Sequence, residues 1–270
     1  MKFKEAAALL AECGIESAKF DAAEIFVRIG GFKKADLLLS DCDSSDVVVL
    51  SAVERRAKRE PLQYILGEVY FYNECYRVTP DCLIPRSDTE ILVEYAVRHI
   101  PEGEVFIDLC TGSGCVGIST LANTKNTAAV LVDLSLPAVE LARENAKKNG
   151  VIERVRLECR DALLPCECEE IFAVLSNPPY VTRKEYDNLM PEIYFEPKMA
   201  FVADNDGLLF YERITEIYKD KIKKGGFIAY EIGKDQGNAL KKIAERFSMD
   251  IEIIKDYSAN DRVAVLRHKP

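Results

Sequence analysis

The chain has 270 residues, 48% of them hydrophobic and 30% charged, with a formal net charge of −9 at pH 7. This composition predicts a cytoplasmic protein with one large and one small domain, and no apolar run approaches the roughly 18 residues that span a membrane. The opening segment carries Glu5 and Glu12, so it does not resemble a signal peptide. The acidic balance argues against stable binding of nucleic acid, which usually requires a basic stripe.

The nine cysteines contain no CxxC pair; they lie at positions 13, 42, 75, 82, 110, 115, 159, 166 and 168. Structural zinc normally requires paired Cys or His ligands at short spacing, and Cys166-Glu167-Cys168 alone does not supply them. We therefore expect free thiols, with no disulfide framework and no metal.

Residues 1–60 show only helical patterns and predict a small helical bundle. Ser17 and Ser44 are the predicted N-caps of two of its helices. The densest basic cluster, 55–59, is expected to be the solvated end of a helix, with a contact to an acidic or RNA-bearing partner as the alternative. We expect this domain to help recognise a macromolecular substrate; the alternative is a purely stabilising cap.

Residues 61–82 form the predicted connector between two domains. Short β-prone runs at 69–72 and 75–78 flank Asn73-Glu74 and predict a β-hairpin. The remaining residues, 83–270, form the predicted large domain.

In the large domain, strand and helix patterns alternate. Strands are expected at 105–107, 128–132, 155–157, 171–175, 226–232, 251–255 and 262–267, and helices at 88–99, 116–122, 135–149, 207–223 and 236–247. Regular alternation predicts an α/β fold with a mainly parallel, doubly wound sheet, and the last two strands suggest an antiparallel edge.

A glycine-rich loop follows the first predicted strand, and two cofactors compete for it. Residues 112–117 match GxGxxG, the dinucleotide fingerprint, with Asp133 about twenty residues further on. However, Asp108 ends the strand just before the glycines. A carboxylate there suits the cationic methyl donor S-adenosylmethionine, whereas it would repel a pyrophosphate.

Two further acids follow the next predicted strands. Asp133 can accept hydrogen bonds from ribose hydroxyls with either cofactor, and Asp161 can accept one from an adenine amino group. Carboxyl ends of parallel strands share one edge of the sheet, where such folds bind ligands. The alternative is that these acids are helix caps or turn formers, which for Asp161 is equally well supported.

The fourth predicted strand leads into Asn177-Pro178-Pro179-Tyr180, which we interpret as a site for a planar amide or amine nitrogen. The lone pair of such a nitrogen is delocalised, so acceptors for both N–H groups would raise its electron density and orient it. The Asn177 side-chain oxygen and the Pro178 carbonyl can be these acceptors. The prolines stiffen the loop, and Tyr180 offers a flat face for stacking.

Several separated motifs between residues 61 and 267 resemble the protein-(glutamine-N5) methyltransferases that modify peptide chain release factors, the PrmC/HemK type. The matching segments are Pro61–Gly67, Leu83–Glu90, Asp108–Gly114, Ser176–Tyr180, Glu196-Pro197 through Asp206-Gly207-Leu208, and Glu231-Ile232-Gly233 with Gln236. The resemblance implies a Rossmann-like class I methyltransferase domain with a seven-stranded sheet. It also implies methylation of the glutamine of the release factor GGQ motif to N5-methylglutamine.

The resemblance also assigns site residues. The implied S-adenosyl-L-methionine site, which would release S-adenosyl-L-homocysteine, comprises Asp108, Cys110, Thr111, Gly112, Ser113, Gly114, Asp133, Leu134, Asp161, Ala162 and Asn177. The implied catalytic residues are Asn177, Pro178 and Tyr180, and the substrate glutamine would also meet Pro179, Phe71, Arg86 and Glu90. The family often has Gly at position 110, and commonly at 204 or 205, where this chain has Cys110, Asp204 and Asn205.

Three alternatives to a glutamine methyltransferase remain. An adenine-N6 DNA or RNA methyltransferase shares the Asn-Pro-Pro-Tyr chemistry, but it would need base flipping and a basic surface. A vestigial cofactor-binding accessory protein would not need intact Asp108, Asp133 and Asn177. A dinucleotide oxidoreductase leaves residues 177–180 without a purpose. We therefore expect a monomeric enzyme whose partners are release factors, with no membrane partner.

Overall fold

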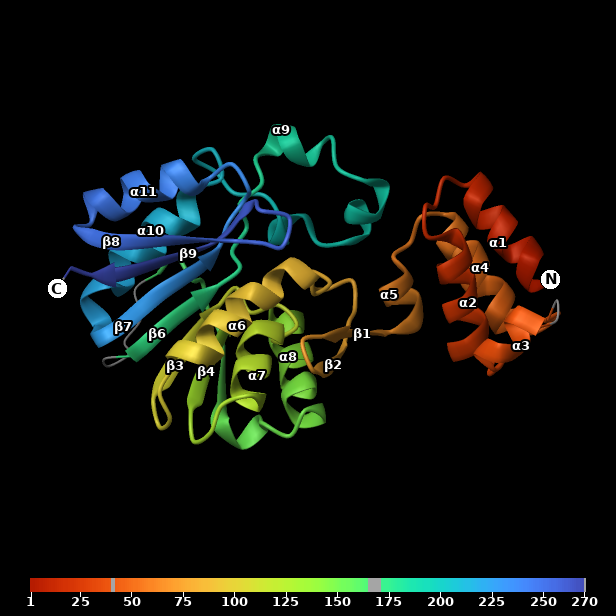
Figure 1. Cartoon of the computed structure of the whole chain (residues 1–270), viewed down its shortest axis with the longest axis horizontal. Helices are drawn as coiled ribbons and strands as arrows, with labels where there is room; N and C mark the ends of the chain where they lie inside the picture. Colours follow the sequence, from red (N-terminus) through yellow and green to blue (C-terminus); the bar gives the residue numbers. More distant parts are fainter. Residues whose placement is uncertain (40–41, 165–170, 270) are drawn as a thin grey trace. The chain divides into compact units, whose positions relative to one another are not determined.

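The computed structural model describes residues 1–39, 42–164 and 171–269, which form two compact units (Figure 1). One unit is Met1–Val69 together with Met190–Phe195, and the other is Tyr70–Leu189 together with Glu196–Pro270. Within these ranges no helix is long and apolar enough to cross a membrane. Cys166 and Cys168, weighed above as metal ligands, lie outside the described residues.

The first unit is a helical bundle, as the apolar spacing predicted. Its helices are α1 (Phe3–Glu12), α2 (Ala18–Arg28), α3 (Lys34–Leu39), α4 (Val47–Ala57) and α5 (Leu62–Leu66). They enclose an apolar core that includes Leu10, Ile25, Phe26 and Val53, all with no exposed surface. Each such side chain contributes about 1.5–3 kcal/mol by leaving water.

One predicted helix cap in this unit is wrong by two residues. Asp46 caps α4, because its carboxylate accepts a hydrogen bond from the Val48 backbone N–H at 2.8 Å. Ser44 instead accepts one from the Asp46 N–H at 3.2 Å and so stabilises the turn before the cap. Ser17 does precede α2, but its side chain makes no capping hydrogen bond.

The basic cluster at the end of α4 is not simply solvated. Arg56 is buried, and its guanidinium donates to Asp21 at 2.7 Å and to Glu192 at 3.2 Å. Arg59 donates to the same Glu192 at 2.8 Å. Glu192 lies in the 3-10 turn Pro191–Phe195, so these ion pairs bring a segment from late in the sequence into the helical unit.

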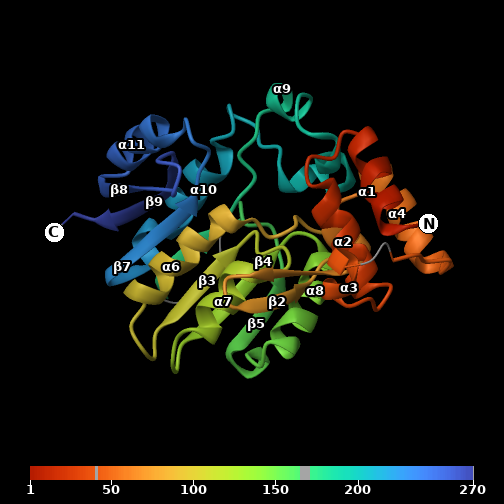
Figure 2. The ribbon, with the colours of Figure 1, turned by 45° about the vertical axis from the view of Figure 1, so that its right-hand side comes forward.

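The predicted hairpin consists of β1 (Glu68–Phe71) and β2 (Glu74–Arg77), and all of it except the first two residues of β1 belongs to the second unit. Its second strand lies against the helix α8 (Leu136–Lys148) (Figure 2). The Asn145 side chain fixes this contact, because it accepts from the Arg77 N–H at 2.8 Å and donates to the Arg77 carbonyl at 3.0 Å.

The described part of the second unit is built on a seven-stranded sheet of order β5-β4-β3-β6-β7-β9-β8. The strands are β3 (Val105–Leu109), β4 (Ala128–Asp133), β5 (Val155–Cys159), β6 (Ile171–Ser176), β7 (Ile222–Glu231), β8 (Met249–Lys255) and β9 (Asp261–His268). β5 through β7 are parallel, and β9 is antiparallel to both of its neighbours, which confirms the predicted antiparallel edge.

Helices cover both faces of this sheet. One face carries α6 (Glu90–His99), α7 (Cys115–Ala122) and α8, which contact one another in turn (Figure 1). The other carries α10 (Leu209–Tyr218) and α11 (Gly237–Arg246), whose apolar side chains join the inward-facing strand residues in one core. The short helix α9 (Arg183–Tyr186) lies between β6 and α10 in the chain, and the remaining described helical turns are 3-10 turns.

The helix predicted over 207–223 is shorter in the structure. α10 ends at Tyr218, and β7 already begins at Ile222, which pairs with Ile171. A bulge then separates this pair from the next, Ala173 with Phe227. The chain therefore leaves the helix and joins the sheet earlier than predicted, and the apolar spacing of the sequence did not indicate this.

Register places the ends of three central strands side by side. Leu109 of β3 pairs with Ser176 of β6, and Ser176 pairs with Tyr230 of β7. The next residues along each strand, Cys110, Asn177 and Glu231, therefore emerge together at the carboxyl edge of the sheet, where ligands bind in this class of fold.

Candidate active site

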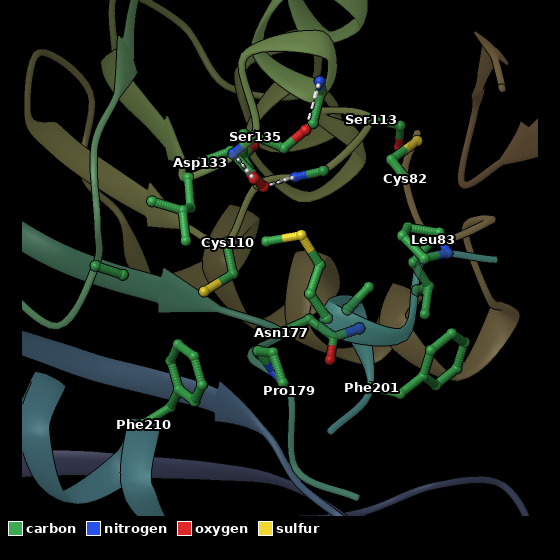
Figure 3. Close-up of a pocket in the computed structure, with 18 of the residues that line it drawn as sticks. Cys82, Leu83, Cys110, Ser113, Asp133, Ser135, Asn177, Pro179, Phe201 and Phe210 are labelled. Carbon is green, nitrogen blue, oxygen red and sulfur yellow. Dashed lines mark hydrogen bonds between the residues drawn. The ribbon is translucent and has the colours of Figure 1, made fainter. Parts of the chain in front are cut away.

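A cavity of about 260 Å³ opens at this carboxyl edge (Figure 3). It is lined by residues of the loops after β3, β4, β5 and β6. Asp133 and Ser135 lie across it from Pro179 and Phe210 (Figure 3). Of the predicted site residues, those that line it are Arg86, Cys110, Thr111, Gly112, Ser113, Asp133, Leu134, Asp161, Ala162, Asn177, Pro179 and Tyr180.

Asp108 lies beneath the glycine-rich loop and is not part of the cavity wall. Its Oδ2 accepts hydrogen bonds from the Thr111 hydroxyl at 2.5 Å and from the Gly117 N–H at 3.0 Å, which fixes the loop to the start of α7. Its other oxygen, Oδ1, is buried and has no hydrogen-bond partner in the part of the chain that the structure describes. Burial raises the pKa of Asp108 to about 7.

Gly114 also supports the loop from outside the cavity. It precedes α7 with φ of 84°, and a Cβ atom there would lie 2.6 Å from a methyl carbon of Ile118. The positive φ therefore favours glycine at this position, and a side chain would also crowd Ile118 and Ala142.

Asp133 ties the loops after β3 and β4 together. Its Oδ2 accepts from the Gly112 N–H at 2.8 Å, and its Oδ1 accepts from the Ser135 N–H at 2.9 Å. Burial raises the pKa of this carboxyl. A carboxylate has about four acceptor positions, so both oxygens can still accept from a ligand.

Asp161 forms a turn and also lines the cavity. Its Oδ1 accepts from the Leu163 N–H at 2.8 Å, which is the turn-forming role weighed above. Its contact to an adenine amino group stays a prediction.

The backbone conformation at Cys110 is one that favours glycine. Its φ is +59°, in the left-handed region where a side chain costs roughly 1–2 kcal/mol relative to glycine. Burial raises the pKa of its thiol well above the ordinary value, so the thiol stays protonated and is not a nucleophile.

The Asn-Pro-Pro-Tyr loop is held from several sides. The Asn177 side-chain N–H donates to the Thr89 hydroxyl at 3.3 Å, and the Tyr180 hydroxyl donates to Glu231 at 3.2 Å. The Tyr180 N–H donates to the Phe201 carbonyl at 3.1 Å. Burial raises the pKa of Tyr180, so its hydroxyl is a donor at neutral pH.

Three predicted substrate residues lie away from the cavity wall. Pro178 is buried and does not line the cavity. Glu90 accepts a hydrogen bond from the Tyr72 N–H at 2.8 Å, and Phe71 packs edge-on against Tyr76. Glu90 and Phe71 thus fix the hairpin in the structure, and their contact with substrate stays a prediction.

The comparisons with known proteins agree with this geometry. The model of the methyltransferase small domain matches residues 87–206, and that of the PrmC N-terminal domain matches residues 3–67. The release factor glutamine methyltransferase of Thermodesulfovibrio yellowstonii is 40% identical over 226 residues, which cover 81% of this chain and 80% of the relative. The chain belongs to the release factor glutamine methyltransferase family.

Other comparisons extend over nearly the whole chain or show the fold. The release factor glutamine methyltransferase of Geobacter sulfurreducens is 33% identical, over 94% of this chain and 91% of the relative. The ribosomal protein L11 methylase of Lactobacillus delbrueckii subsp. bulgaricus superposes with a TM-score of 0.54 at 15% identity, covering 72% of this chain and 85% of that one. The large unit therefore has the class I methyltransferase fold, as predicted.

Several residues for which no role was predicted line the cavity or hold its wall in place. Glu196, in a matched motif, is buried; it accepts from the Ile84 N–H at 2.8 Å and forms an ion pair with Arg86. It thereby holds the segment before α6 at the cavity. The apolar wall residues without a predicted role are Cys82, Leu83, Cys115, Val116, Ala138, Leu163, Val181, Pro197, Met199, Ala200, Phe201 and Phe210.

Proposed function

We propose that this protein transfers the methyl group of S-adenosyl-L-methionine to the side-chain N5 of the glutamine in the GGQ motif of peptide chain release factors. The products are N5-methylglutamine and S-adenosyl-L-homocysteine. The observation that carries the proposal is that Asn177 and Tyr180 share one cavity with the glycine-rich loop and Asp133. Family membership supports glutamine as the acceptor.

The residues present fit the proposed methyl donor. The buried Oδ1 of Asp108, which has no hydrogen-bond partner among the described residues, would accept from the ammonium group of the methyl donor at the glycine-rich loop. Asp133 lines the cavity with spare acceptor capacity for a ribose, and Asp161 with Ala162 would border the adenine. When bound, the cofactor supplies an electrophilic methyl group; the chain's own residues bind and orient the acceptor.

The substrate amide would be held by the Asn-Pro-Pro-Tyr loop. The Asn177 Oδ1 and the Pro178 carbonyl would accept its two N–H groups, which raises electron density on the nitrogen. The Tyr180 ring would stack on the planar amide and exclude water from one side. No strong base is needed, because the nitrogen becomes acidic once it has been methylated and can then release its proton to water.

The proposal is tested with labelled S-adenosylmethionine and either a bacterial release factor or duplex DNA. The wild-type protein should label the release factor and not the DNA, and a Gln→Ala change at the acceptor should abolish the label. Asn177→Ala should lower kcat by about a hundredfold or more, because an acceptor for the reacting group is lost.

The matched control is Asn188→Ala. Asn188 is exposed on the same stretch of chain, and its side chain donates to the Lys184 carbonyl at 2.8 Å, away from the cavity. Its replacement should leave kcat unchanged. Label in DNA but not in the release factor would overturn the proposal.

A further inference from the structure

We propose that Glu231 and Thr89 are positioning residues that fix which end of the Asn177 side-chain amide faces the cavity. The inference rests on the proposed function, in which Asn177 accepts a hydrogen bond from the acceptor amide. It assigns a role to the Glu231-Ile232-Gly233 motif, whose residues do not otherwise act in the proposed reaction.

The strand register brings these groups together. Glu231 ends β7 beside the end of β6, where Asn177 begins its loop. Thr89 lies in the 3-10 turn Ser87–Thr89 immediately before α6. Glu231 and Thr89 are both buried, with 3% and 1% of their surface exposed, so neither has water as an alternative partner.

One carboxylate organises two side chains of the loop. Glu231 Oε2 accepts from the Thr89 hydroxyl at 2.5 Å, and its Oε1 accepts from the Tyr180 hydroxyl at 3.2 Å. The Thr89 oxygen in turn accepts from the Asn177 side-chain N–H at 3.3 Å.

The direction of these hydrogen bonds follows from the chemistry of the groups. An ionised carboxylate can only accept, so the single Thr89 hydroxyl proton must point at Glu231. Thr89 then has only lone pairs left for its other neighbour, and Asn177 must present its NH₂ to them. The Asn177 Oδ1 is thereby directed away from Thr89, which leaves it free as an acceptor for substrate.

Two hydroxyl donors and a guanidinium face the Glu231 carboxyl. Burial is the largest effect and raises the pKa of this carboxyl, as does Asp88, whereas the Thr89 hydrogen bond, the nearby Arg262 guanidinium and the Tyr180 hydroxyl oppose the rise and stabilise the carboxylate. Arg262 also pairs with Asp88 at 3.2 Å and Asp256 at 3.1 Å, which keeps its positive charge in place. The backbone of Glu231 is held as well, because its carbonyl accepts from the Tyr211 hydroxyl at 3.1 Å.

Without this relay the Asn177 amide could rotate by half a turn. The two ends of an amide have nearly the same shape, so hydrogen bonding alone selects between them. The rotated amide would aim an NH₂ group at the NH₂ of the substrate glutamine. Two donors would then face each other, and the hydrogen bond that orients the nitrogen would be lost. Only the rate of the chemical step would fall.

The first test compares Thr89→Val with Thr89→Ser. Valine keeps the shape but lacks the hydroxyl, so kcat should fall by about tenfold or more, while the affinity for S-adenosylhomocysteine measured by calorimetry should stay unchanged. Serine retains the hydroxyl and should restore most of kcat. Glu231→Gln, which replaces one acceptor oxygen with NH₂, should also lower kcat by about tenfold.

A matched control separates positioning from stability. The Thr215 hydroxyl is also fully buried, where it shares a hydrogen bond of 2.9 Å with the Tyr230 hydroxyl outside the cavity wall. Thr215→Val should lower the unfolding temperature to a similar extent as Thr89→Val but leave kcat unchanged. Equal losses of kcat in the two variants would overturn the inference.

The decisive measurement is a double-mutant cycle. If Thr89 acts through Asn177, then Thr89→Val should have no further effect on single-turnover rates in an Asn177→Ala background. An undiminished tenfold loss in that background would show that Thr89 does not act through Asn177.

A spectroscopic test does not depend on activity. In protein labelled with ¹⁵N-asparagine, the Asn177 NH₂ signals are identified by their loss in Asn177→Ala. Thr89→Val should reduce the chemical-shift difference between the two NH₂ protons and speed their exchange with water. Unchanged signals would overturn the inference, whether or not the wild-type protein methylates a release factor. A wild-type protein that methylates no release factor would count against the proposed function alone.

Discussion

Gly207 packs its backbone directly against the carbonyl oxygen of Tyr180. A Cβ atom at this glycine would overlap that oxygen and would lie 3.0 Å from the Gln236 side-chain nitrogen. Gln236 itself donates to the Tyr180 carbonyl at 3.2 Å. The turn before α10 therefore forms a rigid support for the Asn-Pro-Pro-Tyr loop.

Gly207→Ala should disable the loop with little effect on cofactor binding. The new methyl group must displace Tyr180, so kcat should fall by about tenfold or more, because displacements near 1 Å in a site commonly cost this much. Gly225→Ala is the matched control: both glycines have positive φ, of 80° and 84°, but a Cβ atom at Gly225 would meet nothing within 4 Å. The control should share the backbone strain, seen as a lower unfolding temperature, and keep full kcat. Equal activity of the two variants would contradict this account.

The turn also shows what the sequence could and could not predict. The resemblance predicts Gly at position 204 or 205, but this chain has Asp204 and Asn205 there, and Asn205 and Asp206 adopt φ of +56° and +52°. Asn and Asp tolerate this region better than other residues, so the turn survives the substitution. Residue types gave no sign that Gly207 would then approach Tyr180, because that contact depends on how two distant segments pack.

Local chemistry made the sheet and its acidic loops predictable. Asp133 and Asp161 follow strands whose apolar spacing was plain, and both line the cavity. Asp108 was foreseen at the loop but not its burial beneath it, since burial follows from packing of the whole unit. The same limit applies to Thr89, whose hydroxyl matters only because the strand register brings it to Asn177 and Glu231.

The pair Cys110→Gly and Cys110→Ala should separate backbone strain from packing. Both variants lose the thiol, but only glycine relieves the positive φ, so Cys110→Gly should be more stable than Cys110→Ala by about 1 kcal/mol. Chemical denaturation in urea measures the difference. Greater stability of the alanine variant would show that this backbone is unstrained.

Asp108 should make stability and cofactor affinity respond to pH in opposite ways. Its folded-state pKa of about 7 lies above the ordinary value of 3.8, so between these pH values the folded protein holds a proton that the unfolded chain releases. Stability therefore falls as pH rises through this window, and the penalty is complete above pH 7. Asp108→Asn removes the penalty, so its unfolding temperature should exceed that of the wild type increasingly from acid to alkaline pH.

The ligand should reverse that order. If ionised Asp108 accepts from the cofactor's ammonium, S-adenosylhomocysteine should raise the wild-type unfolding temperature more at alkaline than at acid pH, and should raise that of Asp108→Asn little at either. Scanning fluorimetry with and without ligand checks both. A stability gap between the ligand-free proteins that does not change with pH would mean that Asp108 does not titrate in this window.

The helical unit should depend on Arg56 far more than on its neighbour Arg55. Arg56→Ala leaves Asp21 as a buried carboxylate without its guanidinium, and removing one partner of such a pair costs about 3–5 kcal/mol. Arg55 is 44% exposed in its pair with Glu60, so Arg55→Ala should cost about 1 kcal/mol or less. Urea denaturation followed by circular dichroism compares the two.

Because Glu192 also loses the Arg56 guanidinium, amide exchange in Met190–Phe195 should quicken in Arg56→Ala and not in Arg55→Ala. Equal exchange rates in both variants would mean that the ion pair of Arg59 with Glu192 holds this segment in the helical unit instead.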